Sequence, residues 1–219
     1  MARVDLEIMI KNIVEEVMDK LNDNINGSLI PIGVSNRHIH ISRRDLDILF
    51  GKEYELTKLK DLRQPGQYAA KETVTVIGPK GSFEKVRILG PVRKNTQIEI
   101  SMTDGFALGI KAPIRESGKI EDTPGVIIKG PDGSLKINEG VIVALRHIHL
   151  PEDYAGRHGY KDGDMVSVMS SGLRKTTYHN VLLRVSDRYE PEMHIDIDEA
   201  NASGMKNGDK VEIIKSIDD

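Results

Sequence analysis

Short runs of alternating apolar and polar residues, separated by glycine and proline turns, constrain the fold of this chain most strongly. Two of these runs are alike: Gly-Pro-x-Gly follows residues 74–77 at 78–81, and follows residues 126–129 at 130–133. Alternation places successive side chains on opposite faces of a strand, and glycine with proline favours a tight turn. Both segments therefore predict β-hairpins.

Further alternating runs predict more strands, and the chain reads as mainly β with short helices. Aromatic residues make up only 4% of the chain and tryptophan is absent, so the core must rely on Val, Ile and Leu, which favour strands. Residues 45–51 predict a short helix, and residues 58–71 are typical of a loop. The other predicted strands cover residues 38–41, 97–101, 141–150, 165–169, 181–185, 193–197 and 210–214.

The sequence also repeats itself. Arg-His-Ile-His-Ile at 37–41 recurs as Arg-His-Ile-His-Leu at 146–150, with a weaker third copy, His-Ile-Asp-Ile, at 194–197. The second and third copies run on to Asp-Gly-Asp at 162–164 and Asn-Gly-Asp at 207–209 and then to another strand. A unit repeated so few times indicates small β-barrels of duplicated ancestry rather than a solenoid.

Residues 5–21 differ from the rest, because their apolar positions recur at helical spacing. The polar stretch 22–28 that follows reads as a linker. An amphipathic helix with its own linker has two interpretations: it packs on the barrels, or it docks onto a partner.

Composition excludes several functional classes. The chain has 219 residues, a formal net charge of -3 and no cysteine. Without a basic excess a dedicated DNA or RNA binder is disfavoured, and without thiols there are no disulfides, thiolate zinc sites or cysteine acyl-enzymes. The apolar runs are too short to span a bilayer, and the first residues do not resemble a signal peptide, so we expect an intracellular protein.

Histidine carries the chemical information. His38 with His40, and His147 with His149, form two pairs at spacing two, which puts both imidazoles of each pair on one strand face. Paired imidazoles form half of a zinc or cobalt site. His194 is either a third ligand or a hydrogen-bonded structural residue.

An arginine in a loop and a carboxylate in a strand are further candidate functional residues. Arg93 lies in a loop after Gly90-Pro91, with Arg87 and Arg115 in the flanking segments, and arginine suits phosphate or carboxylate. Glu99 alternates with isoleucines and is either a solvated strand residue or a metal ligand. Together with the histidine pairs, these residues predict metal-assisted chemistry on a phosphate or a carbonyl group. We expect His158 and His179 to be structural.

The chain resembles a known family, the PduL-type phosphotransacylases, which are also called phosphate propanoyltransferases. The resemblance covers residues 31–214 and rests on GVSNRHIH (33–40), QPGQYA (64–69), LGPVR (89–93), GIKAPIR (109–115), ALRHIH (144–149) and MHID (193–196). It implies two β-barrel domains and the reversible conversion of acyl-CoA and phosphate to acyl phosphate and CoA. The implied domains are residues 25–40 with 145–215, and residues 41–144, after an N-terminal helix at 1–24.

The resemblance also implies roles for individual residues. His38, His40 and Glu99 match the ligands of one metal ion, usually zinc, and His147, His149 and His194 match those of the other. Arg93 matches an arginine that holds phosphate. Positions matching the coenzyme A site are Ser35, Lys60, Arg87, Leu89 and Asn201.

The same resemblance implies partners and a location, and other functional classes stay open as alternatives to it. The N-terminal helix would be an encapsulation peptide that binds shell proteins of a bacterial microcompartment, and the protein would be a homodimer acting in the compartment lumen. Alternatives are a metal-dependent thioester or phosphoester hydrolase and a non-catalytic microcompartment component. Ser117 is a weak candidate for a hydroxyl nucleophile in place of direct attack by phosphate.

Overall fold

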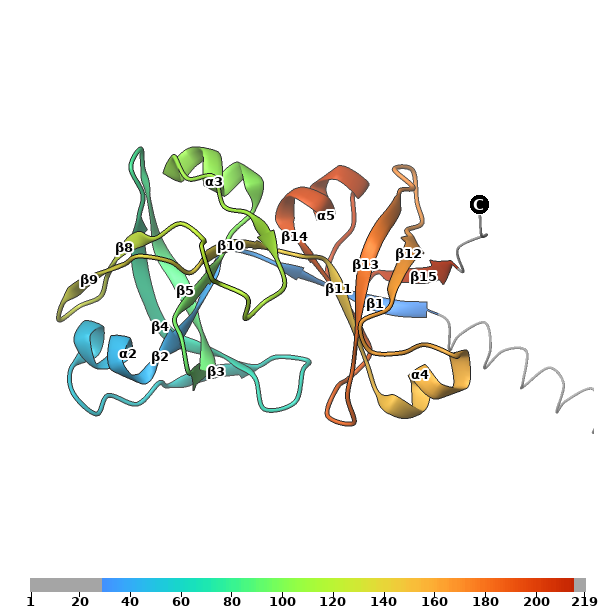
Figure 1. Cartoon of the computed structure of the whole chain (residues 1–219), viewed down its shortest axis with the longest axis horizontal. Coiled ribbons are helices and arrows are strands. Elements are labelled where there is room, and N and C mark those ends of the chain that lie inside the picture. Colours follow the sequence, from blue (N-terminus) through green and yellow to red (C-terminus); the bar gives the residue numbers. More distant parts are fainter. Residues whose placement is uncertain (1–28, 215–219) are drawn as a thin grey trace, which may run out of the picture.

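The computed structural model describes residues 29–214, which form two β-sheet units lying side by side (Figure 1). One unit is a closed barrel and the other is an open sheet, and four short helices accompany them in this part of the chain. The expected mainly β class with short helices is confirmed. The expected helix at residues 1–24 lies outside the described residues.

The closed barrel has the strand order β1-β14-β11-β13-β12-β15 and closes through antiparallel pairing of β1 with β15. Its helices α4 and α5 each follow a strand that carries histidine. Its elements are β1 (Leu29–Ser35), β11 (His147–Leu150), α4 (Glu152–His158), β12 (Met165–Met169), β13 (Thr177–Val185), β14 (Glu192–Asp196), α5 (Ile197–Ser203) and β15 (Lys210–Ile214).

The open sheet has the order β7-β10-β6-β2-β5-β4-β8-β9, with β3 paired to β4. Its elements are β2 (His38–Ser42), α2 (Arg43–Phe50), β3 (Lys58–Asp61), β4 (Tyr68–Ile77), β5 (Ser82–Arg93), β6 (Gln97–Glu99), α3 (Met102–Leu108), β7 (Ile114–Arg115), β8 (Val126–Lys129), β9 (Ser134–Ile137) and β10 (Val141–Ala144).

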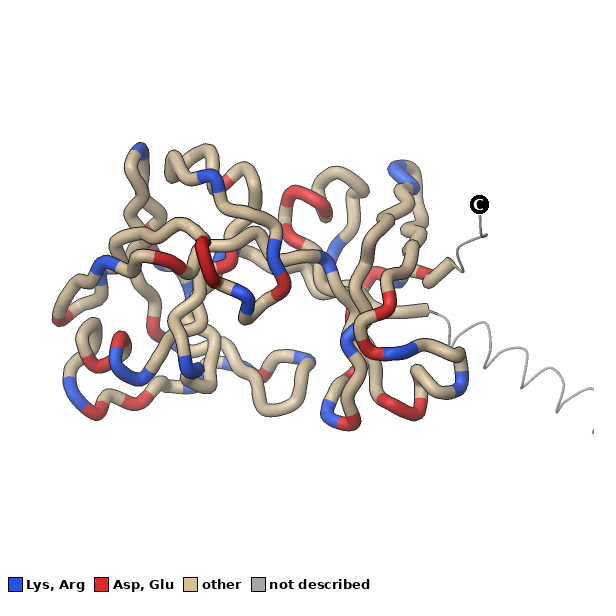
Figure 2. The backbone as a smooth tube through the Cα atoms, viewed as in Figure 1, with Lys and Arg blue, Asp and Glu red and all other residues tan. Residues whose placement is uncertain are grey.

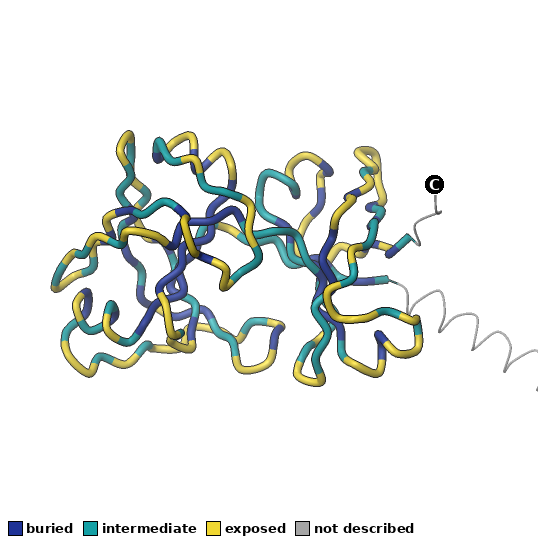
Figure 3. Tube along the Cα trace, viewed as in Figure 1, coloured by how far each residue is buried: buried dark blue, intermediate teal, exposed yellow. Residues whose placement is uncertain are grey.

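Each unit has a hydrophobic core of its own. Ile39 and Ile41 of β2 are fully buried in the core of the open sheet, and Ile148 and Leu150 of β11 are fully buried in the core of the barrel. Buried residues follow the strands, while many turns and loops are exposed (Figure 3). Strand alternation therefore turns the histidines of β2 and β11 away from their own cores.

Two peptide crossovers join the units. The chain leaves the barrel between β1 and β2 and returns between β10 and β11, so each histidine pair begins directly after a crossover. The strand expected at 141–150 is therefore wrong: β10 pairs in the open sheet and β11 in the barrel. β2 also pairs in the open sheet, so the chain changes sheets before residue 38, whereas the predicted domain boundary follows residue 40. The division into domains stays a prediction.

The segment expected to be a loop at 58–71 instead contains β3 and the start of β4. All four residues of β3 are exposed, so the strand has no apolar alternation that would mark it in the sequence. It forms because its backbone pairs with β4 in an antiparallel ladder.

The open sheet has an internal repeat that the sequence analysis missed. Ile-His-Ile-Ser at 39–42 matches Ile-Glu-Ile-Ser at 98–101, and Ser42 and Ser101 each cap the following helix by accepting a backbone N–H. Glu99 is therefore the counterpart of His40. One copy of the repeat therefore has an imidazole at the position where the other copy has a carboxylate.

Both predicted hairpins are confirmed, and each packs on the helix of the other half. Lys80 of the β4–β5 turn donates its N–H to the Leu108 carbonyl at the end of α3 (3.0 Å), and Asp132 of the β8–β9 turn donates to Leu49 of α2 (3.0 Å). A Cβ added to Gly78 or Gly130 would collide with the same carbonyl oxygens. Glycine is required here by close approach of two backbones.

Charged residues of both signs are spread along the chain in both units (Figure 2). Within the described residues, no helix is both long and apolar enough to cross a membrane.

We expect Gly78→Ala and Gly130→Ala each to lower the free energy of unfolding by about 1–3 kcal/mol, because the new methyl group meets backbone. Gly156→Ala in α4 is the matched control, since its Cβ would meet nothing within 4 Å. The control should gain about 0.5–1 kcal/mol from helix propensity. Denaturant unfolding measures all three, and equal stability of the Gly78 and Gly156 variants would contradict the close approach.

Candidate metal centre and anion cleft

The structure assembles two clusters of potential metal ligands. His38, His40 and Glu99 form one, and His147, His149 and His194 form the other; within each, one ligand atom per residue lies within 4.8 Å of the others. Strand register explains both sets: His38 pairs with Glu99 across β2 and β6, and His147 pairs with His194 across β11 and β14. The six residues gather as the sequence analysis expected.

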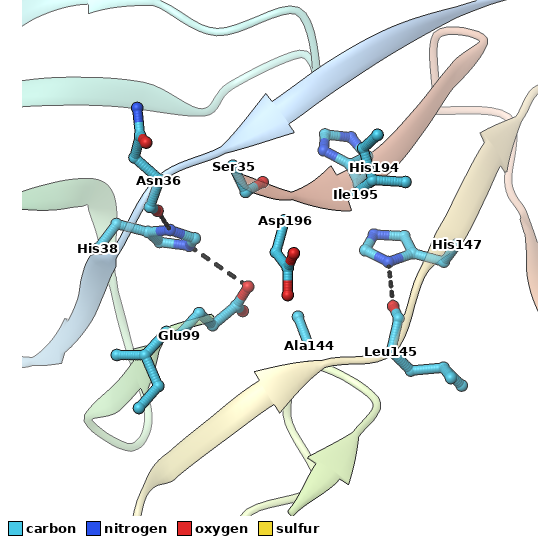
Figure 4. Close-up of a pocket in the computed structure, with 11 residues that line it drawn as sticks. Ser35, Asn36, His38, Glu99, Ala144, Leu145, His147, His194, Ile195 and Asp196 are labelled. Atoms are coloured by element: carbon cyan, nitrogen blue, oxygen red, sulfur yellow. Dashed lines mark hydrogen bonds and ion pairs between the residues drawn. The ribbon is translucent and has the colours of Figure 1, made fainter. Parts of the chain in front are cut away.

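The two clusters face each other where the units meet. One pocket is lined by His38 and Glu99 from the open sheet and by His147 and His194 from the barrel (Figure 4). The rest of its wall is formed by Ser35, Asn36, Ile100, Ala144, Leu145, Ile195 and Asp196. The site therefore belongs to neither unit alone.

Each cluster has a hydrogen bond that fixes one imidazole. His38 Nδ1 lies 2.8 Å from the Asn36 carbonyl, and His147 Nδ1 lies 2.8 Å from the Leu145 carbonyl. An Nδ1–H donated to the carbonyl leaves Nε2 with a free lone pair, as is common for metal-binding histidine. The two crossover peptides thus orient equivalent residues in the two clusters.

Glu99 is ionised although it is buried. Gln97 and Ser117 donate hydrogen bonds to its Oε1 at 2.6 Å and 2.8 Å, and its Oε2 lies 3.4 Å from His38 Nε2. Burial alone would raise the pKa of this carboxyl, but His38, His40 and the Ser117 hydroxyl outweigh it and hold the pKa at about 2. Glu99 therefore offers an anionic oxygen at neutral pH.

Three of the imidazoles are neutral. Burial, then the neighbouring His38, lower the pKa of His40 to about 3. Burial and His194 lower that of His147 to about 4, and burial and His147 lower that of His149 to about 2. Neutral imidazole is the metal-binding form, so desolvation holds these side chains ready for a cation.

The second cluster contains a buried nitrogen that no protein group satisfies. His149 Nδ1 is buried without a hydrogen-bond partner, and the buried His194 Nε2 lies 3.1 Å from Glu192 Oε2. Buried nitrogens of this kind are costly unless a ligand uses them. The donors therefore fit a divalent transition metal such as zinc or cobalt.

A larger cleft includes all six cluster residues and extends beyond them. It measures about 820 Å³, which is within the size range of cofactor sites, and it reaches from His40 and His149 to β3. Six basic side chains line it against the two carboxylates of Glu99 and Glu192; the six are Arg37, Lys60, Arg63, Arg87, Arg93 and Arg184. This excess of positive charge suits a ligand that carries several phosphates.

The sequence-predicted residues are distributed unevenly around this cleft. Ser35, Lys60, Arg87, Leu89 and Arg93 line it, together with Ser117. Strand register sets Arg87 beside His38 and Leu89 beside His40. Asn201 is exposed on α5 and does not line the cleft, whereas Asn207 does, and its Oδ1 accepts the Val34 N–H at 2.7 Å. His158 and His179 also lie outside it.

Two residues that the sequence analysis missed lie next to the second cluster. Arg184 pairs with His149 across β11 and β13, and the Tyr189 ring lies 4.3 Å from the His149 ring. Both line the cleft with Arg93, whose pKa is lowered by burial. Neither belongs to a motif, so only the register with His149 could have identified Arg184.

The loop between β3 and β4 contacts the barrel next to the second cluster. The buried Gln64 amide donates to the Glu190 carbonyl at 3.0 Å and to Glu192 Oε2 at 3.2 Å. Gly33 makes room for Glu192, since a Cβ there would lie 2.8 Å from its Oε1. Gln64 thus links the open sheet to the strand that carries His194.

The pKa values predict how the metal-free protein responds to pH. Below about 6.5 the unfolded chain protonates His40, His147 and His149, whereas the folded chain does not until about pH 4, so the unfolded state binds more protons. The melting temperature of chelator-treated protein should therefore fall as the pH is lowered from 7 to 5.

Two variants test which histidine causes the fall in melting temperature on acidification. His149→Asn should reduce the slope, while His179→Asn, at an exposed position, should leave it unchanged. A melting temperature that is constant or rises on acidification would show that these imidazoles are not held neutral.

Known proteins are similar to this chain over most of its length. A family model described as phosphate propanoyltransferase matches residues 31–206. A phosphate propanoyltransferase of Thermotoga maritima is 56% identical over 187 residues, which are 85% of this chain and 89% of that protein. One from Rhodopseudomonas palustris is 54% identical over 186 residues (85% and 82%), and one from Sebaldella termitidis is 50% identical over 208 residues (95% and 96%).

Proposed function

The chain belongs to the phosphate propanoyltransferase family and is an acyltransferase, and from this premise we propose that it converts a short-chain acyl-CoA and phosphate to acyl phosphate and CoA at a two-metal site. Propanoyl-CoA and acetyl-CoA are the candidate substrates. The reaction is reversible.

One observation carries the proposal: two ligand clusters face each other within a cleft that six basic side chains also line. His38, His40 and Glu99 would hold one ion, and His147, His149 and His194 the other. Three protein ligands in each set leave a coordination position open for substrate, as catalytic zinc sites require. When bound, the ions would supply Lewis-acid polarisation and positive charge near the reacting carbonyl and phosphate.

Arg93 and Arg184 are the proposed phosphate-binding side chains. Both line the cleft, and burial, together with the nearby charge of Arg184, lowers the pKa of Arg93. Two guanidinium groups brought together in this way favour binding of an anion between them. They would hold phosphate with one oxygen directed at the thioester carbonyl carbon.

Coenzyme A would occupy the part of the cleft that leads to β3. Lys60 and Arg63 supply positive charge there, and Ser35 and Leu89 line the wall nearer the clusters. Arg87 donates to the Ala70 and Lys71 carbonyls at 3.0 Å and 2.7 Å, which holds its guanidinium against β4. For Asn201 the proposed contact requires coenzyme A to extend beyond the cleft to the exposed side of α5.

Direct attack by phosphate is the step we propose. A phosphate oxygen forms a bond with the carbonyl carbon, the carbon–sulfur bond breaks, and the CoA thiolate leaves and takes up a proton. Ser117 is a poor alternative nucleophile: its hydroxyl donates to Glu99 and accepts from Gln97 and Arg93. Glu99, with a pKa of about 2, is also too weak a base to activate it at neutral pH.

Other properties remain predictions. Shell-protein binding in a microcompartment depends on residues 1–24, which lie outside the described part of the chain. Homodimer formation is likewise a prediction, to be checked by light scattering.

The central experiment measures CoA thiol release from propanoyl-CoA and acetyl-CoA with and without phosphate, together with the metal content of the same sample. We expect release only with phosphate, formation of acyl phosphate, about two transition-metal ions per chain, and loss of activity on chelation. Release of free acid without phosphate would instead identify a hydrolase, and full activity in metal-free protein would overturn the two-metal site.

Arg93→Ala should raise the KM for phosphate more than that for acyl-CoA and should lower the rate, because a charge-assisted contact to phosphate is lost. Arg93→Lys should restore activity only partly, since a point charge lacks the planar fork. Steady-state kinetics with each substrate varied separately measures both effects. Equal changes in the two KM values would show that Arg93 does not bind phosphate.

A further inference from the structure

The two crossovers between the units carry equivalent arginines. Arg37 and Arg146 each immediately precede the first histidine of a pair, and each begins the same Arg-His-Ile-His sequence. The carbonyls that orient His38 and His147 belong to Asn36 and Leu145, the residues just before these arginines. Any movement of a crossover peptide would therefore turn an imidazole.

Each arginine is anchored in the same way. Arg37 Nη2 lies 2.6 Å from Asp104 Oδ1, and Arg146 Nε lies 2.9 Å from Glu199 Oε1. Both carboxylates are the third residue of a helix whose N-terminus is closed by a reciprocal capping box. The anchors are thus fixed to the rigid starts of α3 and α5.

Aromatic rings hold the guanidinium groups from a second side. The Arg37 guanidinium lies 4.0 Å from the centroid of the Phe83 ring, and that of Arg146 lies 5.4 Å from the Tyr178 ring. Stacking of this kind restricts the arginine beyond what one ion pair does. Two unrelated contacts therefore define each side chain.

The anchors are also joined to each other. The Thr103 N–H at the start of α3 donates to Asp198 Oδ2 of α5 at 2.8 Å, and the two helices lie side by side (Figure 1). Asp104 and Glu199 are the next residues along the two helices. This hydrogen bond holds the two anchor helices next to each other.

We infer that Arg37 and Arg146 are positioning residues, each of which fixes the crossover carbonyl that orients the first histidine of its own metal cluster. The inference rests on the proposed metal sites and adds two residues that are not metal ligands, although Arg37 also lines the cleft. Loss of one arginine affects its own cluster and leaves the other intact.

The test uses full-length protein titrated with Co²⁺ in competition with a chromophoric chelator. The His₂Glu and His₃ ligand sets differ, so their cobalt absorption bands should differ, and His40→Gln and His149→Gln assign them. Arg37→Ala should weaken cobalt binding at the first cluster by about 10–100-fold, and Arg146→Ala should do the same at the second.

Arg43→Ala is the matched control. Arg43 has a side-chain exposure of 38%, against 39% for Arg37 and 31% for Arg146, and it also pairs with a carboxylate, but it lies on α2 away from both crossovers. Its removal should leave both cobalt affinities unchanged. If an alanine variant fails to fold, Arg37→Lys and Arg146→Lys should show a smaller loss at the same individual cluster.

Each outcome decides between the claims. Site-selective loss supports the inference. Two intact cobalt sites in the arginine variants, or equal weakening of both sites by either variant, would overturn it while the proposed metal sites stand. Failure of the wild-type protein to bind cobalt would overturn the metal sites and this inference together.

Discussion

The site depends on one constraint, that a strand with one face in its own core presents its other face to the neighbouring unit. In β2 the isoleucines Ile39 and Ile41 fill the open-sheet core, so His38 and His40 must point outward; β11 repeats this with Ile148 and Leu150. Because the units meet over these outward faces, the polar residues are enclosed by partners rather than by water. The hydrophobic cores thereby determine where the imidazoles lie.

Enclosure changes the chemistry of the side chains. Imidazoles next to each other with little water resist protonation, and the carboxylate among them keeps its charge through donors from Gln97 and Ser117. Buried unpartnered nitrogen is unfavourable on its own, as at His149 Nδ1. The same arrangement that would destabilise an empty fold favours a bound cation, so stability and function are coupled at this interface.

Features of the site that depend on neighbouring residues could be predicted from the sequence, whereas features that depend on pairing of distant strands could not. The histidine pairs were identified because a period of two is a local property of a strand, and the structure confirms that each pair shares a face. Glu99 required the family resemblance, since its register with His38 joins strands far apart in the chain. Arg184 was missed for the same reason. The break between β10 and β11 was missed because the apolar character runs on from residues 141–144 into 147–150 while the chain changes sheets.

The path of the chain through the two units has a consequence for its synthesis. β1 pairs with β14 and β15, so that Ile32 lies beside Met193, and the whole open sheet is made between them. A ribosome releases β1 long before its neighbours exist, whereas β2 to β10 can form their sheet as soon as they emerge. The nascent chain would therefore carry an unpaired strand ahead of a folded unit, and barrel closure would be the late, long-range step that also assembles the second histidine cluster.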